Sequence, residues 1–216
     1  FVVLNQGIIK GSAFTGSVKG QNYVRGFVYK NDRTIIQSYI KGDVECNSGY
    51  ECAGFVYVND GLIQNSYSSG NVANGAGFAY VNNGSITNSH ATNSVVDGSG
   101  FIDQNSKLIE NCHAVGKVTI TRGSFGYGGF VKTNDSVIRN SFSDVEFVDG
   151  IFDSFPLPQV GGFAGVNSGL IERSYSKGSV FGSLDVGTFV GINVGTIQNI
   201  YAIGDLYRGP ANASSW

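Results

Sequence analysis

The chain has 216 residues, of which 14 are basic and 16 are acidic, so its formal charge is −2. Charged residues make up only 14% of the sequence, which leaves no electrostatic basis for binding nucleic acid or an anionic membrane surface. No stretch approaches the roughly 18 consecutive apolar residues of a membrane-spanning helix, so we expect no direct insertion into a membrane.

The sequence is built from eight repeats, each of which opens on a phenylalanine. The spacings between these phenylalanines are 26, 28, 23, 23, 29, 33 and 26 residues, and the residues are Phe1, Phe27, Phe55, Phe78, Phe101, Phe130, Phe163 and Phe189. Four positions later each repeat has an asparagine: Asn5, Asn31, Asn59, Asn82, Asn105, Asn134, Asn167 and Asn193. Self-similarity of this length indicates a stacked repeat architecture.

Further along each repeat, at offsets counted from the phenylalanine, the pattern continues. Isoleucine stands at offset eight in all eight copies, and an apolar residue stands at offset seventeen. Glycine stands at offset six in five copies and at offset fifteen in six. We expect both glycine positions to need a positive φ, and we interpret the apolar offsets as inward-facing positions of short strands.

These patterns predict an all-β fold, a parallel β-solenoid of about eight coils with repeats of 23–33 residues. We expect one domain over residues 1–216, with almost no helix and with the asparagines stacked in a hydrogen-bonded structural ladder. Because the chain has no methionine and Phe1 already opens a repeat, we expect a fragment of a longer polypeptide. The pattern leaves open the direction of the side chains at offset twelve.

The linkers between repeats hold the residues that do not repeat. In the segment CNSGYEC, Cys46 and Cys52 are close enough in sequence for a short disulfide, although two reduced thiols fit the spacing as well. Such a bridge is typical of an oxidising compartment.

Two later linkers are the candidate contact loops. Residues 148–161, VDGIFDSFPLPQVG, combine acidic and aromatic side chains, and residues 119–129 hold a basic and an aromatic side chain that could stack on sugars. The residues we single out for binding are Asp149, Phe152, Asp153, Phe155, Arg122 and Tyr127. The alternative for the longer linker is that it folds back and covers an apolar patch.

Three asparagines stand in glycosylation sequons. Asn83 and Asn212 are the possible acceptors, whereas Asn134 belongs to the asparagine ladder, where a glycan would conflict with stacking.

Other candidate chemistry is weaker than its structural alternative. His90 and His113 share offset twelve in adjacent repeats and could hold a metal, but that column is otherwise largely aromatic, so we expect stacking and no metal site. Cys112 lies next to His113 in the sequence, which raises the question of a Cys-His nucleophile. Adjacent side chains of a strand point to opposite faces, so we expect no such pair here. Asp32 and Asp60 occupy one offset in consecutive repeats, and paired acids of this kind are typical of polysaccharide-cleaving β-helices.

The segment from Gly161 to Val180, GGFAGVNSGLIERSYSKGSV, resembles the GLUG repeat, and the other seven copies are degenerate forms of it. Gly162, Phe163 and Gly165 match its opening, and Ser174 and Tyr175 match its close. The resemblance covers nearly the whole chain. It implies a segment of a large secreted or surface-anchored protein, such as a filamentous adhesin, and it specifies architecture more strongly than function.

We therefore expect a non-enzymatic extracellular adhesin, stalk or filament segment at the cell surface, without a cofactor. Its expected partners are a glycan or protein on a host or neighbouring cell, or other copies in a filament. The alternative is a carbohydrate-active parallel β-helix enzyme, which should gather acids, a base and aromatic residues from nonrepeated positions into one groove.

Overall fold

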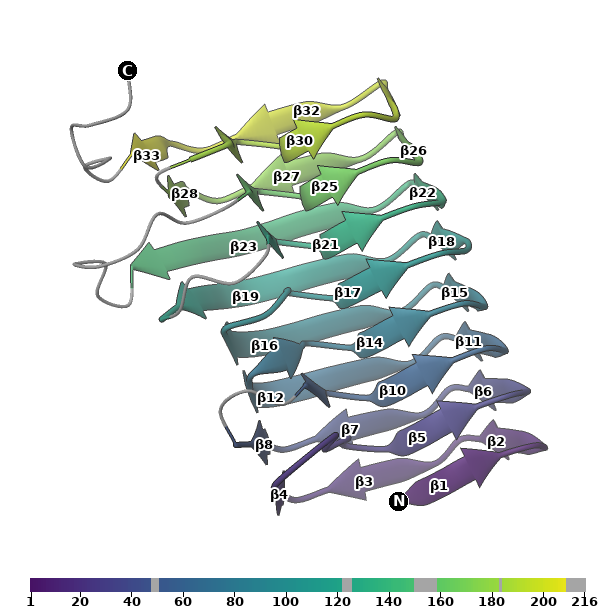
Figure 1. Cartoon of the computed structure of the whole chain (residues 1–216). Coiled ribbons are helices and arrows are strands. Elements are labelled where there is room, and N and C mark those ends of the chain that lie inside the picture. The colour runs from purple at the N-terminus through teal and green to yellow at the C-terminus, as the bar shows by residue number, and fades with distance from the viewer. Residues whose placement is uncertain (48–50, 122–125, 150–158, 183, 209–216) are drawn as a thin grey trace.

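The fold is a stack of short parallel strands with no helix among the described residues, which confirms the predicted all-β solenoid (Figure 1). The computed structural model describes residues 1–47, 51–121, 126–149, 159–182 and 184–208, with only the backbone of Asp149 and Arg208. In this part of the chain no helix that could cross a membrane is found.

Three long parallel sheets form the walls of the solenoid, and each receives one strand from every coil in sequence order. Sheet A contains β1 (Val2–Asn5), β5 (Val28–Asn31), β10 (Val56–Asn59), β14 (Ala79–Asn82), β17 (Ile102–Asn105), β21 (Val131–Asn134), β25 (Ala164–Asn167) and β30 (Val190–Asn193). Sheet B contains β2 (Ile8–Lys10), β6 (Thr34–Ile36), β11 (Leu62–Gln64), β15 (Ser85–Thr87), β18 (Ile109–Glu110), β22 (Val137–Arg139), β26 (Leu170–Glu172) and β31 (Thr196–Gln198).

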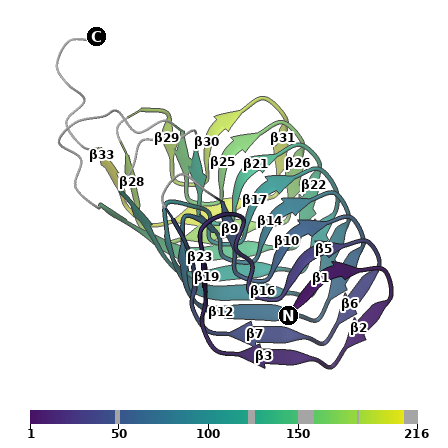
Figure 2. The same cartoon turned by 60° about the horizontal axis from the view of Figure 1, so that its bottom comes forward.

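Sheet C is the widest wall, because its central strands are the longest in the chain. It contains β3 (Ala13–Thr15), β7 (Tyr39–Lys41), β12 (Tyr67–Ala73), β16 (His90–Val96), β19 (His113–Ile120), β23 (Phe142–Asp149), β27 (Tyr175–Lys177) and β32 (Tyr201–Ile203), joined by β4 (Val18–Gly20) and β8 (Val44–Cys46). Each coil therefore forms one rung of three walls, and eight rungs are stacked. Figure 2 shows the rungs following one another around a common interior.

Small sheets complete the rungs along one edge, where the chain leaves sheet C and returns to sheet A. They are β9 (Cys52–Ala53) with β13 (Gly75–Ala76), β20 (Tyr127–Gly128) with β24 (Val160–Gly161) and β29 (Val186–Gly187), and β28 (Val180–Gly182) with β33 (Leu206–Arg208). The extra residues of the longer repeats all enter here, between the end of sheet C and the start of sheet A. We call this side of the solenoid the linker edge.

Strict register keeps the repeated side chains in continuous inward columns. The phenylalanine rings stack with centroids 4.5–4.9 Å apart, and Phe27 to Phe163 are fully buried. The isoleucines at offset eight pair with one another along sheet B. Each buried ring or isoleucine contributes about 2 kcal/mol of hydrophobic stabilisation, so the columns supply much of the stability of the stack.

The asparagines form one directional ladder through all eight rungs. Each Nδ2 donates to the Oδ1 of the next rung at 2.7–2.8 Å, from Asn5 to Asn193. The same amide groups bond to nearby backbone; Asn59 Nδ2, for example, also donates to the Gly61 carbonyl at 3.2 Å. These contacts satisfy buried polar groups and hold the corner between sheets A and B in place.

The two glycine positions differ from one another in backbone conformation. All six glycines at offset fifteen have a positive φ, between 107° and 151°, as predicted. The prediction of a positive φ at offset six is wrong, since none of those glycines has one. There the need is for space, because a Cβ at Gly84 would lie 2.0 Å from the Gly61 carbonyl oxygen of the rung below.

The sequence analysis did not predict the corner at offset ten, where the backbone adopts the left-handed conformation. Gly11 and seven non-glycine residues at this offset have φ values of 47–58°: Gln37, Asn65, Asn88, Asn111, Asn140, Arg173 and Asn199. The frequency of asparagine was the available signal, because asparagine tolerates this conformation better than most residues. The corner turns the chain from sheet B into sheet C and fixes which side chains of sheet C face outward.

Candidate functional site

The residues predicted to bind on the linkers are not brought together as one described site. Arg122, Phe152, Asp153 and Phe155 lie outside the described residues, and Asp149 is described by its backbone alone, at the end of β23. The prediction for Tyr127 is wrong. Its side chain is 1% exposed because β20 pairs with β24 and turns the ring into the core.

The remaining linker and sequon predictions fall at several separate places. A disulfide joins Cys46 and Cys52, whose Cα atoms lie 6.1 Å apart. Asn83 is exposed and its Nδ2 donates to Asp60 Oδ1 at 3.0 Å, whereas Asn134 is fully buried in the ladder. Asn212 lies outside the described residues.

The outer face of sheet C carries a continuous column of stacked rings at offset twelve. Neighbouring rings lie 4.7–5.0 Å apart with planes within 7° of parallel, in the order Tyr39, Tyr67, His90, His113, Phe142, Tyr175 and Tyr201. Most of these side chains are half-buried, and Tyr201 is 50% exposed. We call this row the aromatic column; it answers the question of side-chain direction that the sequence left open.

The two histidines are part of the aromatic column. Their ring centroids lie 4.7 Å apart and the planes are 2° from parallel, so the nitrogen lone pairs lie in parallel planes and do not converge on one metal ion. Burial lowers the pKa of both imidazoles, and the charge of His90 lowers that of His113 further. Within the described ranges no group of three or more His, Cys, Asp or Glu residues could hold a metal.

Cys112 is separated from this histidine pair by the wall of the sheet. Its thiol is 1% exposed and donates to the Glu110 carbonyl at 3.2 Å, and burial raises the thiol pKa to about 12. The side chain of His113 faces outward in the aromatic column instead. A buried thiol without a base beside it has no activated thiolate to act as a nucleophile.

The two aligned aspartates share one lysine as their ion-pair partner. Lys30 Nζ lies 3.0 Å from Asp32 Oδ1 and 3.2 Å from Asp60 Oδ2. Asp60 also accepts the hydrogen bond from Asn83. This arrangement crosslinks the turns of consecutive rungs and gives the carboxylates a structural role.

One acid that the sequence analysis missed is buried beneath the linker edge. Asp103 is 5% exposed, its Oδ1 has no hydrogen-bond partner, and burial raises its pKa. It occupies the outward offset at which the preceding rungs have the stacked rings of Tyr29, Tyr57 and Tyr80. Lys132 follows in the next rung, and its charge favours the ionised form of Asp103.

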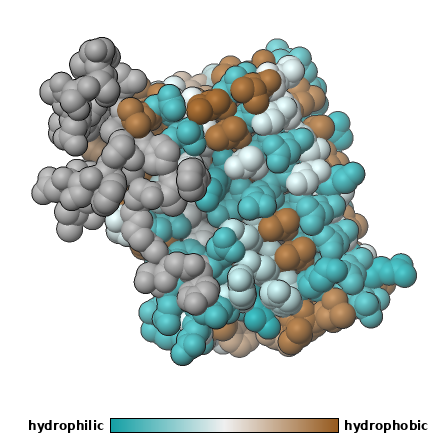
Figure 3. Space-filling model, viewed as in Figure 1, coloured by the Kyte–Doolittle hydropathy of each residue, from teal (hydrophilic) through white to brown (hydrophobic). Residues whose placement is uncertain are grey.

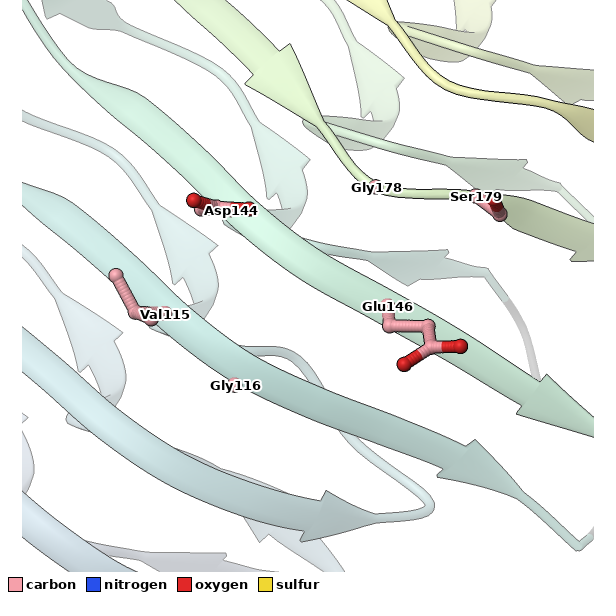
Figure 4. A pocket seen from close by; sticks show the side chains of 6 residues that line it. All are labelled: Val115, Gly116, Asp144, Glu146, Gly178 and Ser179. Atoms are coloured by element: carbon pink, nitrogen blue, oxygen red, sulfur yellow. The ribbon is translucent and has the colours of Figure 1, made fainter.

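A hollow of about 420 Å³ lies on the outer face of sheet C, close to the linker edge (Figure 4). It spans three consecutive rungs and is lined by Val115 and Gly116 of β19, by Asp144 and Glu146 of β23, and by Gly178 and Ser179. The two carboxylates stand two residues apart on one strand, so both point outward on the same face. We call this depression the sheet C hollow.

Charged side chains of both signs surround the hollow. In the strand register Lys117 stands opposite Glu146, and Lys177 stands opposite Asp144. All four side chains are exposed, and among the described residues none of them takes part in an ion pair. Lys177 Nζ lies instead 5.7 Å from the centroid of the Tyr175 ring.

On the face seen in Figure 3, hydrophobic residues occur at several separate places with polar residues between them. Scattered apolar residues of this kind are normal on a soluble surface. The sheet C hollow with its neighbouring aromatic column is therefore the best candidate site in the described part of the chain.

Comparisons with models of known families, with curated proteins and with solved structures find no match to this chain.

Proposed function

We propose that this chain is a non-enzymatic segment of a secreted or surface-displayed protein, an adhesin or stalk in which a rigid solenoid presents its linker edge to a partner. The observation that carries the proposal is that the repeats differ in length at one place only, the linker edge. The strands of all three walls pair in register from rung to rung, whereas the repeats differ in length only after offset eighteen, between sheet C and sheet A. Recognition residues are often found on variable loops held by a rigid scaffold.

The resemblance to the GLUG repeat supports the same proposal. The clearest copy, from Gly161 to Val180, runs from the end of β24 into β28, so it corresponds to most of one rung. That repeat is found in large proteins of the cell surface. The Cys46–Cys52 disulfide is consistent with an oxidising, extracellular location.

The rival reading as a carbohydrate-cleaving enzyme has less support. Its best sequence feature was the pair Asp32 and Asp60, and both carboxylates bind Lys30 in a tight corner. The carboxylates of the sheet C hollow are exposed on an open surface, where water competes for every hydrogen bond. Such a surface suits binding better than catalysis, because acid catalysis benefits from a site that excludes water.

Binding of the purified chain to intact cells and to immobilised surface extracts tests this proposal. The informative variant replaces residues 150–158 by a short Gly-Ser turn, which leaves β23 and β24 with its buried Val160 in place. A second variant keeps the length and composition of this stretch but permutes its order. Loss of specific binding in both variants, with unchanged circular dichroism, is the expected result. Equal binding by the replaced variant, or no specific binding by the original chain, contradicts a role of this linker in adhesion.

A further inference from the structure

The charges around the sheet C hollow cancel one another. Two carboxylates, Asp144 and Glu146, stand on β23 between two lysines: Lys117 is the register partner of Glu146 on β19, and Lys177 is that of Asp144 on β27. Neighbouring strands are about 4.8 Å apart. The formal charges of these side chains sum to zero, so the hollow attracts neither a polyanion nor a polycation strongly. A neutral ligand suits this surface best.

The same groups offer many hydrogen bonds that the protein does not use. The carboxylates are acceptors without an ion-pair partner in the described residues, and the lysines are donors. Ser179 adds a hydroxyl that can do both. A ligand that presents closely spaced donors and acceptors without carrying charge has the chemistry of a sugar, whose hydroxyls can form charge-assisted hydrogen bonds with all of these groups.

The hollow also provides apolar contacts. Val115 contributes to its lining, and two positions before Val115, Asp144 and Lys177 on their strands stand His113, Phe142 and Tyr175 of the aromatic column. These rings use their faces on one another, so an outside ligand meets their edges. The C–H groups of a sugar ring can pack against Val115 and the ring edges while its hydroxyls reach the charged groups.

From this combination we propose that the sheet C hollow binds a neutral glycan lying along the axis of the solenoid. Successive rungs repeat every 4.8 Å or so, which lets an extended chain of sugars meet equivalent positions on β19, β23 and β27. The inference deepens the proposed adhesive function and rests on it, since it names the ligand class. It places recognition on the wall of the solenoid as well as on the linkers.

A printed array that holds neutral glycans of many linkages beside the sialylated and sulfated forms of the same cores is the probe. We expect retention of neutral glycans and weaker signals for the acidic forms, because an added anionic group gains no net attraction from a surface whose charges cancel and still loses part of its hydration on binding. The neutral glycan that is bound best then serves as ligand in titration calorimetry. Asp144→Asn with Glu146→Gln should weaken its binding about tenfold, because charge-assisted hydrogen bonds become neutral ones.

A matched pair of variants separates the hollow from the rest of the wall. Val115→Arg fills the hollow, whereas Thr92→Arg adds the same side chain at the register partner of Val115 in the neighbouring rung, outside the hollow. We expect Val115→Arg to abolish binding and Thr92→Arg to retain it. Asp135→Asn, which removes an exposed carboxylate at a distant turn, should leave the affinity unchanged.

Three results overturn the inference: no neutral glycan retained on the array, acidic forms bound as well as neutral ones, or equal binding by the two arginine variants. Preference for cationic peptides over glycans would also contradict it. If the chain binds cells through residues 148–161 while Val115→Arg has no effect, adhesion stands and the glycan site fails.

Discussion

Replacing Asn82 by alanine tests the idea that the asparagine ladder is a principal source of stability. The Asn82 side chain is fully buried; its Oδ1 accepts from Asn59 Nδ2 and its Nδ2 donates to Asn105 Oδ1, both at 2.8 Å. Two hydrogen bonds of about 1 kcal/mol each are lost, and two buried partners lose their best contact. Their fallback contacts are longer, 3.2 Å from Asn59 Nδ2 to the Gly61 carbonyl and 3.4 Å from the Lys107 N–H to Asn105 Oδ1.

We therefore expect Asn82→Ala to lower the free energy of unfolding by about 2–4 kcal/mol. Asn83→Ala is the matched control, since the neighbouring asparagine is exposed and makes one side-chain bond, to Asp60. Its expected cost is below about 1 kcal/mol. Urea unfolding followed by circular dichroism measures both, with the slope m compared to detect partial unfolding of individual rungs.

If the two alanine variants differ by less than about 1 kcal/mol at equal m, the ladder contributes little and the reasoning is refuted. The hydrophobic columns alone would then have to hold the rungs in register. Strong coupling between neighbouring rungs would instead make the loss at Asn82 larger than the sum of its two bonds, and the sign of the prediction would be unchanged.

Three further predictions follow from individual residues. Burial raises the pKa of Asp103 in the folded protein, so the unfolded chain ionises first, and stability falls as pH rises from the ordinary carboxyl pKa towards the pKa in the folded protein. Asp103→Asn should therefore raise the urea midpoint at pH 8 and change it little at pH 3. Gly42→Ala should cost more than about 2 kcal/mol in thermal unfolding, since its φ is 151° and a Cβ would lie 2.0 Å from the Gly16 carbonyl oxygen, whereas Gly7→Ala, with open space around the added atom, should be nearly neutral. Cys112, buried with a pKa of about 12, should resist iodoacetamide at pH 8 in the folded protein and react completely in urea, as mass spectrometry would show; rapid labelling without urea contradicts its burial.

The repeated columns were predictable because each of them is encoded eight times. A phenylalanine, an asparagine or an isoleucine that recurs at one offset has a single environment to fit, and stacking in register is the arrangement that supplies it. Offset ten shows the limit of this logic. Its asparagines serve a left-handed corner, and Gln37 and Arg173 at the same offset obscure the pattern.

Tyr127 shows how a linker can mislead. An aromatic residue in a glycine-rich segment was expected to be exposed, but the segment continues into β20, whose partners β24 and β29 extend the core along the linker edge. The pairing of Tyr127 with Val160 joins residues from different repeats. Nothing local to either linker distinguishes this pairing from a loop.

The sequence by itself determined the solenoid, its rung count and the inward columns, because those features depend on spacing that repeats along the chain. Only the tertiary structure decided what faces the solvent on sheet C. The corner at offset ten sets the alternation of side chains, so that the aromatic column and the charged residues around the hollow share the outer face. Val115, Asp144 and Ser179 are 29 and 35 residues apart in the chain, and they meet because consecutive rungs place distant residues one strand spacing from each other.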